Sequence, residues 1–268
     1  MQSQKNGIRL IASDLDGTLL RSDGSVSERT LAALERTVAT GIRFVLVSAR
    51  SSGWLAPEAA RLGLGEIAIC NNGALVYDIE GERVLLHRPL DPETASDIAS
   101  GLRRAAPGVA FGCDRPSGFM AEPAYRPLHR PPDSIPRAEL DALLAGPITK
   151  LVLQHPEIPQ AALHRLVVEL GGERIEACYS GAGLIEIAAA GVTKGSALAE
   201  LCAELGIERA ETIAFGDMIN DIPMLEWAGR GVAVANAHPE LLAVANEVTT
   251  SNDEDGVALV LERLLDRG

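Results

Sequence analysis

Strands and helices alternate through the first 70 residues of the chain, and each predicted strand ends in a small polar cluster. Apolar runs rich in Ile, Leu and Val predict strands at residues 8–13, 42–47 and 66–70. Helices are predicted between them, and Ser27 caps the first one. This alternation predicts a parallel sheet with right-handed crossovers, whose ligand crevice lies outside the carboxyl ends of the strands. We therefore expect the polar clusters to converge.

The α/β pattern is interrupted in the middle of the chain. The intervening residues predict short strands, helices and a proline-dense segment, which indicate a smaller α+β domain inserted into the α/β one. One of its helices is predicted at about residues 137–145. We expect a Rossmann-like parallel-sheet core made of residues 1–82 and 191–268, with the inserted α+β domain at residues 83–190.

The composition restricts the partners of the chain. Of its 268 residues 47% are hydrophobic and only 3% are aromatic, so the apolar mass is Ala, Leu, Val and Ile, which suits helices packed on a parallel sheet. The formal net charge is −13 and the sequence has no run of Lys or Arg. We therefore expect neither nucleic acid nor a membrane as a partner. If the substrate is anionic, a bound cation is favoured.

The sequence has no apolar secretion signal at its start, and no apolar run reaches the ~18 residues of a membrane span. These observations predict a cytoplasmic protein, which we expect to be a monomer or a homodimer. The four cysteines are scattered without a CxxC pair, which predicts buried free thiols rather than a zinc site.

The first strand ends in two carboxylates with one residue between them, Asp14 and Asp16. Because residues i and i+2 of an extended chain point to the same side, both can face one spot beyond the strand end. Gly17 follows and permits a tight turn with a close backbone approach to a ligand. Two acids at one small site repel each other unless a cation or a shared proton offsets the repulsion. The pair therefore fits a metal site or acid/base and nucleophilic chemistry, although alone it also fits an ordinary strand exit.

Two later segments carry further polar groups. Lys194 stands at the start of a predicted helix, where exposed N–H groups and the helix dipole favour an anion. Three polar residues, Asp217, Asn220 and Asp221, directly follow a predicted strand. Taken singly, the lysine fits a solvated charge and the acidic segment fits a turn that caps a helix.

Together, these segments resemble the haloacid dehalogenase superfamily of phosphatases, whose four motifs occur here in order. They are Asp14-Leu-Asp16-Gly-Thr-Leu, Ser48, Lys194 and Gly216-Asp217-x-x-Asn220-Asp221. The inserted domain resembles the type IIB cap of that superfamily. Four further segments are similar to its Cof-type branch: Ser48-x-Arg50, Asn72-Gly73-Ala74, Ala235-Asn236-Ala237 and Asn252-x-x-Asp255-Gly256-Val257. The resemblance covers nearly the whole chain.

The resemblance implies a Mg²⁺-dependent phosphatase that hydrolyses small-molecule phosphate monoesters. Asp14 would be the nucleophile and would form an aspartyl-phosphate, which divides one difficult step into two. Asp16 would protonate the leaving alkoxide and then accept a proton from water. These residues also fit that chemistry directly, because hydrolysis of a phosphate dianion needs neutralised charge and an aligned attacking oxygen.

The remaining motif residues are expected to hold the metal and the phosphoryl group. Mg²⁺ would lie between Asp14, the backbone carbonyl of Asp16 and Asp217, because it prefers oxygen ligands. Asn220 and Asp221 would orient this shell or belong to it. The phosphoryl oxygens would be held by the side chains of Ser48 and Lys194 and by the backbone N–H groups of Gly17 and Thr18.

Candidate substrate contacts lie at two strand ends and in the proline-dense part of the insert. They are Arg50, Asn72, Arg115, Arg126, His129 and Arg130, and most such loop charges are simply solvated. The resemblance implies sugar phosphates or phosphorylated cofactors such as pyridoxal phosphate or flavin mononucleotide as substrates.

Other functions remain open at this point. A phosphomutase or a phosphate-binding module could share the same motifs. A calcium site of the EF-hand type is a rival from another class, because Ser251-x-Asp253-x-Asp255-Gly256 is followed by Glu262 at the twelfth position. Against it, the first position is Ser rather than Asp, and a strand-like segment precedes the loop instead of a helix.

Overall fold

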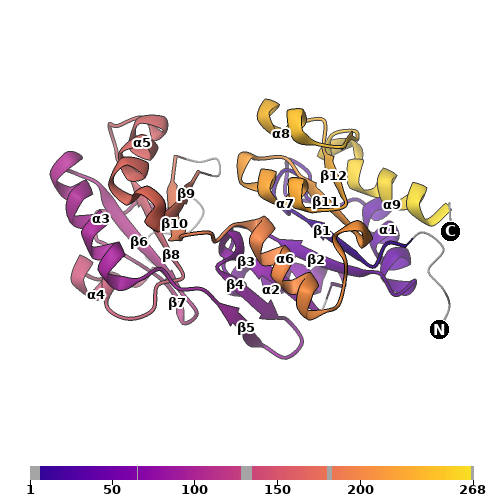
Figure 1. The fold of residues 1–268 in the computed structure, drawn as a ribbon, viewed down its shortest axis with the longest axis horizontal. Coiled ribbons are helices and arrows are strands. Elements are labelled where there is room, and N and C mark those ends of the chain that lie inside the picture. The colour runs from indigo at the N-terminus through magenta and orange to yellow at the C-terminus, as the bar shows by residue number, and fades with distance from the viewer. Residues whose placement is uncertain (1–6, 65, 128–134, 180–182, 267–268) are drawn as a thin grey trace. The chain divides into compact units, whose positions relative to one another are not determined.

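The structure, a computed structural model, describes residues 7–64, 66–127, 135–179 and 183–266. The chain divides into two compact units (Figure 1). We call Met1–Leu85 with Thr193–Gly268 the core unit, and Leu86–Val192 the inserted unit. The role of the inserted unit as a cap domain stays a prediction.

The core unit is built on a largely parallel sheet. Among the described residues this sheet has eight strands in the order β13-β12-β11-β1-β2-β3-β4-β5. The five pairings from β13 to β3 are parallel, and β4 returns antiparallel to β3. The strands are β1 (Leu10–Ser13), β2 (Arg43–Val47), β3 (Ile67–Cys70), β4 (Leu75–Asp78), β5 (Arg83–His87), β11 (Thr212–Gly216), β12 (Arg230–Ala233) and β13 (Glu247–Val248).

Helices cover this sheet, as the near-continuous apolar strands require. In β1 all four residues are buried, which is typical of a strand with both faces covered. Figure 1 shows α1 beside α9 and α6 beside α7, and the two helices of each pair are in contact. The helices are α1 (Glu28–Ala39), α2 (Ser52–Arg61), α6 (Lys194–Glu204), α7 (Ile222–Trp227), α8 (Pro239–Val244) and α9 (Gly256–Asp266). The predicted Rossmann-like α/β fold is confirmed.

The inserted unit has an antiparallel sheet in the order β7-β6-β8-β10-β9, with five strands among the described residues. Alternate residues of these strands, such as Phe111, Leu151 and Ile187, pack with the helices in one apolar core. This pattern is expected where helices cover one face of a sheet. The elements are α3 (Pro92–Ala105), β6 (Ala110–Arg115), β7 (Gly118–Ala121), α4 (Leu140–Leu144), β8 (Lys150–Gln154), α5 (Gln160–Gly171), β9 (Ile175–Cys178) and β10 (Ile185–Ala189).

One predicted helix is shorter than expected. The sequence predicts a helix at about residues 137–145, but α4 includes only Leu140–Leu144. The residues before it are extended, because Ala121 N–H donates to Pro136 O and Ala138 N–H donates to Ala121 O, both over 3.0 Å. Pairing with the end of β7 therefore replaces the first helical turn.

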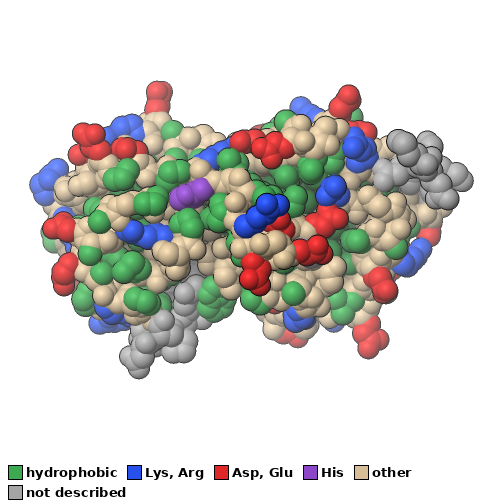
Figure 2. Space-filling view, turned by 90° about the horizontal axis from the view of Figure 1, so that it is seen from below, with side chains coloured by type: hydrophobic (Ala, Val, Ile, Leu, Met, Phe, Trp, Pro, Cys, Tyr) green, Lys and Arg blue, Asp and Glu red, His purple; other side chains and the backbone are tan. Residues whose placement is uncertain are grey.

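The charged side chains on one face and the four cysteines can be compared with the composition. On the face in Figure 2, acidic and basic side chains of the described residues are dispersed, and no extended basic patch is visible there. None of the four cysteines, all within the described residues, forms a disulfide bond; three are buried as predicted, whereas Cys178 is partly exposed. No helix within the described ranges combines the length and the apolar composition needed to cross a membrane.

Candidate active site

Four loops of the core unit meet at the carboxyl edge of the parallel strands. Asp14 follows β1, Ser48 follows β2, Asn71 follows β3 and Asp217 follows β11. The strands bring the first and last of these together, since β1 pairs with β11 in register and Asp14 N–H donates to Phe215 O over 3.0 Å. This edge is where open α/β sheets bind their ligands.

A buried lysine joins two of these loops. Lys194 Nζ donates to Asp14 Oδ1 over 2.6 Å and to Asp221 Oδ1 over 2.5 Å. Thr193 caps α6 and accepts a hydrogen bond from Ser196 N–H, so the helix starts at the lysine. Burial alone would lower the pKa of Lys194, but the Asp14 and Asp221 carboxylates hold it above its usual value. The buried lysine is therefore charged at neutral pH.

The acids around this lysine are also buried. Burial raises the pKa of Asp14 well above its usual value, and Lys194 opposes that rise. Burial, followed by the nearby Asp221 carboxylate, raises the pKa of Asp217 to about 6. Thr18 Oγ1 donates to Asp217 Oδ1 over 2.8 Å. One lysine thus faces three carboxylates, which leaves the group with excess negative charge when all are ionised.

This carboxylate group fits a hard divalent cation. Carboxylate oxygens of Asp14, Asp217 and Asp221 all lie within 4.8 Å of one another. Both carboxylate oxygens of Asp221 already accept hydrogen bonds: Oδ1 accepts from Lys194, and Oδ2 accepts from the N–H groups of Asp217 and Met218 over 3.1 and 3.0 Å. Asp14 and Asp217 accept fewer hydrogen bonds than Asp221, so these two side chains could hold the cation.

Gly17 is required beside this group. It has a φ of 83°, and a Cβ atom at this position would lie 2.5 Å from Asp217 Oδ2. Asn236 holds the same loop, because its Nδ2 donates to Gly17 O over 2.8 Å. The Asn236 side chain also accepts from Asn252 N–H over 2.9 Å. Asn236 and Asn252 thus support the loop after β1. The sequence marked their two segments through the Cof-type resemblance but predicted no role for them.

Asp16 is not part of the buried group. Its carboxylate is paired with the Arg50 guanidinium, with Nε to Oδ2 at 2.8 Å and Nη2 to Oδ1 at 2.5 Å. The two side chains are 53% and 31% exposed. The sequence predicted that Asp14 and Asp16 face one spot, whereas here the two acids have separate partners.

Ser48 lies buried between two neighbouring loops. Its Oγ accepts from Arg50 N–H, and its carbonyl accepts from Asn72 N–H, both over 3.1 Å. The Asn72 side chain reaches the segment after β11, because Asn220 Nδ2 donates to Asn72 Oδ1 over 3.0 Å. Ser48, Asn72 and Asn220 are thus connected within the core unit.

The candidate contacts in the inserted unit have local partners where they are described. Arg115 Nη2 donates to Leu143 O over 2.5 Å, at the end of α4. Arg126 Nη1 donates to Pro123 O over 2.9 Å. His129 and Arg130 lie outside the described residues. A substrate role for these side chains stays a prediction.

The calcium-site alternative has no geometric support. Asp253 accepts from Ser22, Asp255 from Arg21, and Glu262 from the guanidinium of Arg29. These carboxylates serve separate partners instead of converging. Among the described residues, the carboxylate group that could hold a metal is the one at Asp14.

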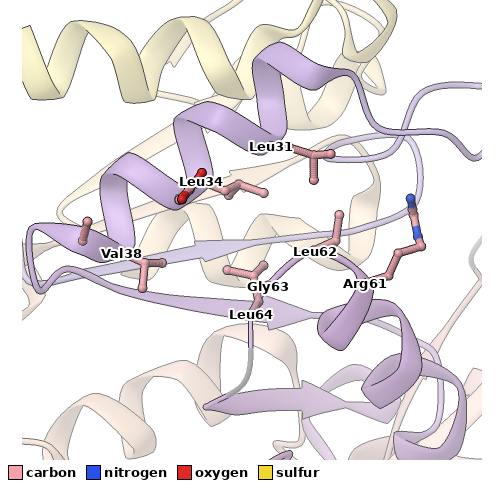
Figure 3. Close-up of a pocket in the computed structure, with 9 residues that line it drawn as sticks. Leu31, Leu34, Val38, Arg61, Leu62, Gly63 and Leu64 are labelled. Atoms are coloured by element: carbon pink, nitrogen blue, oxygen red, sulfur yellow. The ribbon is translucent and has the colours of Figure 1, made fainter.

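A separate hollow of about 500 Å³ lies between α1 and the residues that follow α2 (Figure 3). In Figure 3, Leu34 and Val38 of α1 face Leu62 and Leu64. Because residues 62–64 lead into β3, this hollow lies toward the amino ends of the strands, away from the carboxylate group.

Comparisons with known proteins match almost the whole chain. Residues 11–261 match a family model described as haloacid dehalogenase-like hydrolase. The pyridoxal phosphate phosphatase YbhA of Escherichia coli is 31% identical, over 93% of this chain and 96% of its own length. The phosphatase YwpJ of Bacillus subtilis is 30% identical, over 96% of this chain and 100% of its own length.

The fold has close counterparts among solved structures. One is the sugar phosphatase BT4131, described as subclass IIB of the same superfamily, with a TM-score of 0.82. It is 22% identical, and the match covers 95% of this chain and 98% of the other. At this identity the comparison concerns the fold alone.

Proposed function

Because the chain belongs to the haloacid dehalogenase-like hydrolases and is a phosphoric monoester hydrolase, we propose that it is a Mg²⁺-dependent phosphatase of small phosphorylated molecules. The resemblance inferred from the sequence is confirmed by this membership. The aspartyl-phosphate intermediate, the metal and the roles of single residues are parts of the proposal.

The observation that carries the proposal is the buried contact of Asp14 with Lys194 beside Asp217. A carboxylate nucleophile must approach a phosphate dianion, and the two negative charges repel each other. Lys194 supplies a fixed positive charge at Asp14 Oδ1. Mg²⁺, held by Asp14 and Asp217, would supply the remaining neutralisation by polarising the phosphoryl group.

In the first step, the second oxygen of Asp14 forms a bond to phosphorus while the bond from phosphorus to the leaving oxygen breaks. Lys194 and Ser48 hold phosphoryl oxygens, together with the backbone N–H groups of the Gly17 loop. Asp16, acting as an acid, gives its proton to the leaving alkoxide. The products of this step are an alcohol and the phosphorylated Asp14.

In the second step, water attacks the phosphorus of the phosphorylated Asp14 and gives a proton to Asp16. The bond from phosphorus to the Asp14 oxygen breaks, which releases inorganic phosphate and restores the carboxylate. Both steps require the Asp16 carboxyl at the leaving or attacking oxygen. Asp16 must therefore exchange its Arg50 contact for the substrate, and Arg50 becomes available to the phosphoryl group.

The substrate class is proposed from the chemistry of the site and from the related proteins. Sugar phosphates and phosphorylated cofactors fit a site for a small phosphate monoester, and one relative is named for pyridoxal phosphate. A cytoplasmic location and a monomeric or homodimeric state stay predictions.

The direct test is phosphate release from a panel of phosphate esters, with and without Mg²⁺, using Asp14→Asn as the blank. We expect release that requires Mg²⁺, disappears with EDTA and is lost in the variant. No release from any ester, together with transfer of phosphate between hydroxyl groups, would instead identify a mutase. Release that persists after thorough metal removal would contradict the metal role.

A further inference from the structure

The turn after β3 has an uncommon backbone. Asn71 and Asn72 both adopt the left-handed conformation, with φ of 53° and 56°, and Gly73 follows with φ of 103°. Two consecutive left-handed residues that are not glycine are rare, although Asn tolerates this region better than most residues. Such conformations persist where surrounding contacts hold them, and they gather at functional sites.

Three parts of the core unit hold this turn: the loop after β2, the start of α6 and the segment after β11. Asn71 N–H donates to Arg50 O over 2.9 Å, and Asn72 N–H donates to Ser48 O over 3.1 Å. On another side, a Cβ atom at Gly73 would lie 2.2 Å from Thr193 O, so the turn lies directly against the start of α6. The backbone is thereby fixed between the phosphate-binding Ser48 and the cap residue of the Lys194 helix.

The third part that holds the turn is the segment after β11, which the side chain of Asn72 contacts. Asn72 is 5% exposed, and its Oδ1 accepts from Asn220 Nδ2 over 3.0 Å. Asn220 Oδ1 is buried and accepts no hydrogen bond among the described residues. An amide has one donor end and one acceptor end, so the bond to Asn72 decides which end is committed. The oxygen of Asn220 is the end that is left.

We propose that Asn72 is a positioning residue that sets the amide orientation of Asn220 and so leaves its oxygen, not its nitrogen, for the magnesium shell. Mg²⁺ and its waters take oxygen ligands, and an amide nitrogen facing them would present hydrogen atoms instead. The inference rests on the Mg²⁺ site of the proposed function. It differs from the predicted role of Asn72 as a substrate contact, because Asn72 acts here through Asn220.

The test is a double-mutant cycle with Asn72→Gly and Asn220→Ala, read out by calorimetric titration with Mg²⁺ alone. Glycine adopts a positive φ without strain, so Asn72→Gly removes the acceptor and keeps the turn. We expect each single variant to raise the Kd for Mg²⁺ at least fivefold. The double variant should bind no more weakly than Asn220→Ala, because Asn72 has no effect once the Asn220 amide is gone.

Two further variants separate orientation from backbone effects. Glu82 also has a positive φ, 47°, in the turn between β4 and β5, so Glu82→Gly is a matched control and should leave the Kd unchanged. Asn72→Asp keeps an acceptor oxygen and should bind Mg²⁺ no more weakly than the wild type. It also keeps the inference testable if Asn72→Gly does not fold.

Three results would overturn the inference: an unchanged Kd in Asn72→Gly, effects that multiply in the double variant, or a fivefold loss in Asn72→Asp. Phosphate release by the wild type is scored separately. Suppose that the wild type binds Mg²⁺ and the double variant binds it no more weakly than Asn220→Ala, but no ester is hydrolysed. The proposed function then fails while the role of Asn72 stands. If esters are hydrolysed and the effects multiply, only the role of Asn72 fails.

Discussion

Lys194 Nζ donates to Asp14 Oδ1 over 2.6 Å, and both side chains are buried. The two residues are far apart in the sequence, and this ion pair joins the first loop of the core unit to the start of α6. The pair stands beside two further carboxylates. Its charge balance is therefore the property that substitutions test most directly.

Asp14→Asn should remove turnover and leave the fold intact. The amide cannot form the proposed aspartyl-phosphate. The fold should persist because burial already raises the pKa of Asp14 and disfavours its ionised form, which the neutral amide replaces. The checks are phosphate release and thermal unfolding of the variant in EDTA. Retained activity with a matched circular dichroism spectrum would refute the nucleophile assignment.

Lys194→Met should destabilise the metal-free protein by about 3 kcal/mol or more, because it leaves buried carboxylates without their cation. Mg²⁺ should stabilise this variant more than the wild type, since the ion replaces part of the lost charge. Thermal unfolding in EDTA and in Mg²⁺ measures both effects. The double variant with Asp14→Asn is the control and should recover stability; a wild-type Tm for Lys194→Met in EDTA would contradict the prediction.

In EDTA, the stability of the protein should depend on Asp217. Its pKa is about 6 in the folded chain against 3.8 for the usual side chain. Between these values the folded chain binds more protons than the unfolded one, so this group lowers the free energy of unfolding as the pH rises and has a constant effect above about 6. The gap between Asp217→Asn and wild type, from urea unfolding, should therefore grow from pH 4 to pH 6. A gap that does not change over this window would refute the assignment.

Arg50→Lys should lower kcat/KM roughly tenfold or more, because a lysine cannot reproduce the two-pronged contact with Asp16 or with a phosphoryl group. Stability should change by less than about 0.5 kcal/mol, since both side chains of the pair are partly exposed to solvent. Arg43→Ala, which breaks the exposed pair with Glu66, is the matched control and should keep full activity. Equal kinetics in both variants would remove Arg50 from the site.

Lys150→Met should destabilise the inserted unit by about 3 kcal/mol. Lys150 Nζ donates to Glu186 Oε1 over 2.8 Å, and both side chains are buried on neighbouring strands β8 and β10. The variant removes the cation beside a buried carboxylate. Proteolysis of the folded protein and thermal unfolding measure the loss, and a Tm within a degree of the wild type would argue against it.

The sequence was sufficient for the fold and for the convergence of the strand ends. Strand periodicity and polar clusters predicted that the loops at Asp14, Ser48 and Asn72 would meet, because parallel strands share one carboxyl edge. The places of Asp217 after a strand and of Lys194 at a helix start followed from local pattern. That both would join Asp14 was expected only from the family resemblance.

Pairings between side chains from separate loops were beyond that reasoning. Nothing in the pattern distinguishes an Asp16 that faces Asp14 from one that pairs with Arg50, since both lie on the permitted side of the strand end. The bond between Asn72 and Asn220 likewise depends on a left-handed turn that Asn permits but does not require. The short α4 depended on pairing with Ala121, which is a tertiary contact.

The central place of β1 has a consequence for synthesis of the chain. β1 is translated soon before its neighbour β2, whereas its other neighbour, β11, follows about 200 residues later. Until β11 emerges, that side of β1 keeps an unpaired row of N–H and C=O groups, which is a template for pairing with another chain. The inserted unit, whose pairings are local, can fold during this interval. The nascent core unit is therefore open to pairing with other chains until β11 has been made.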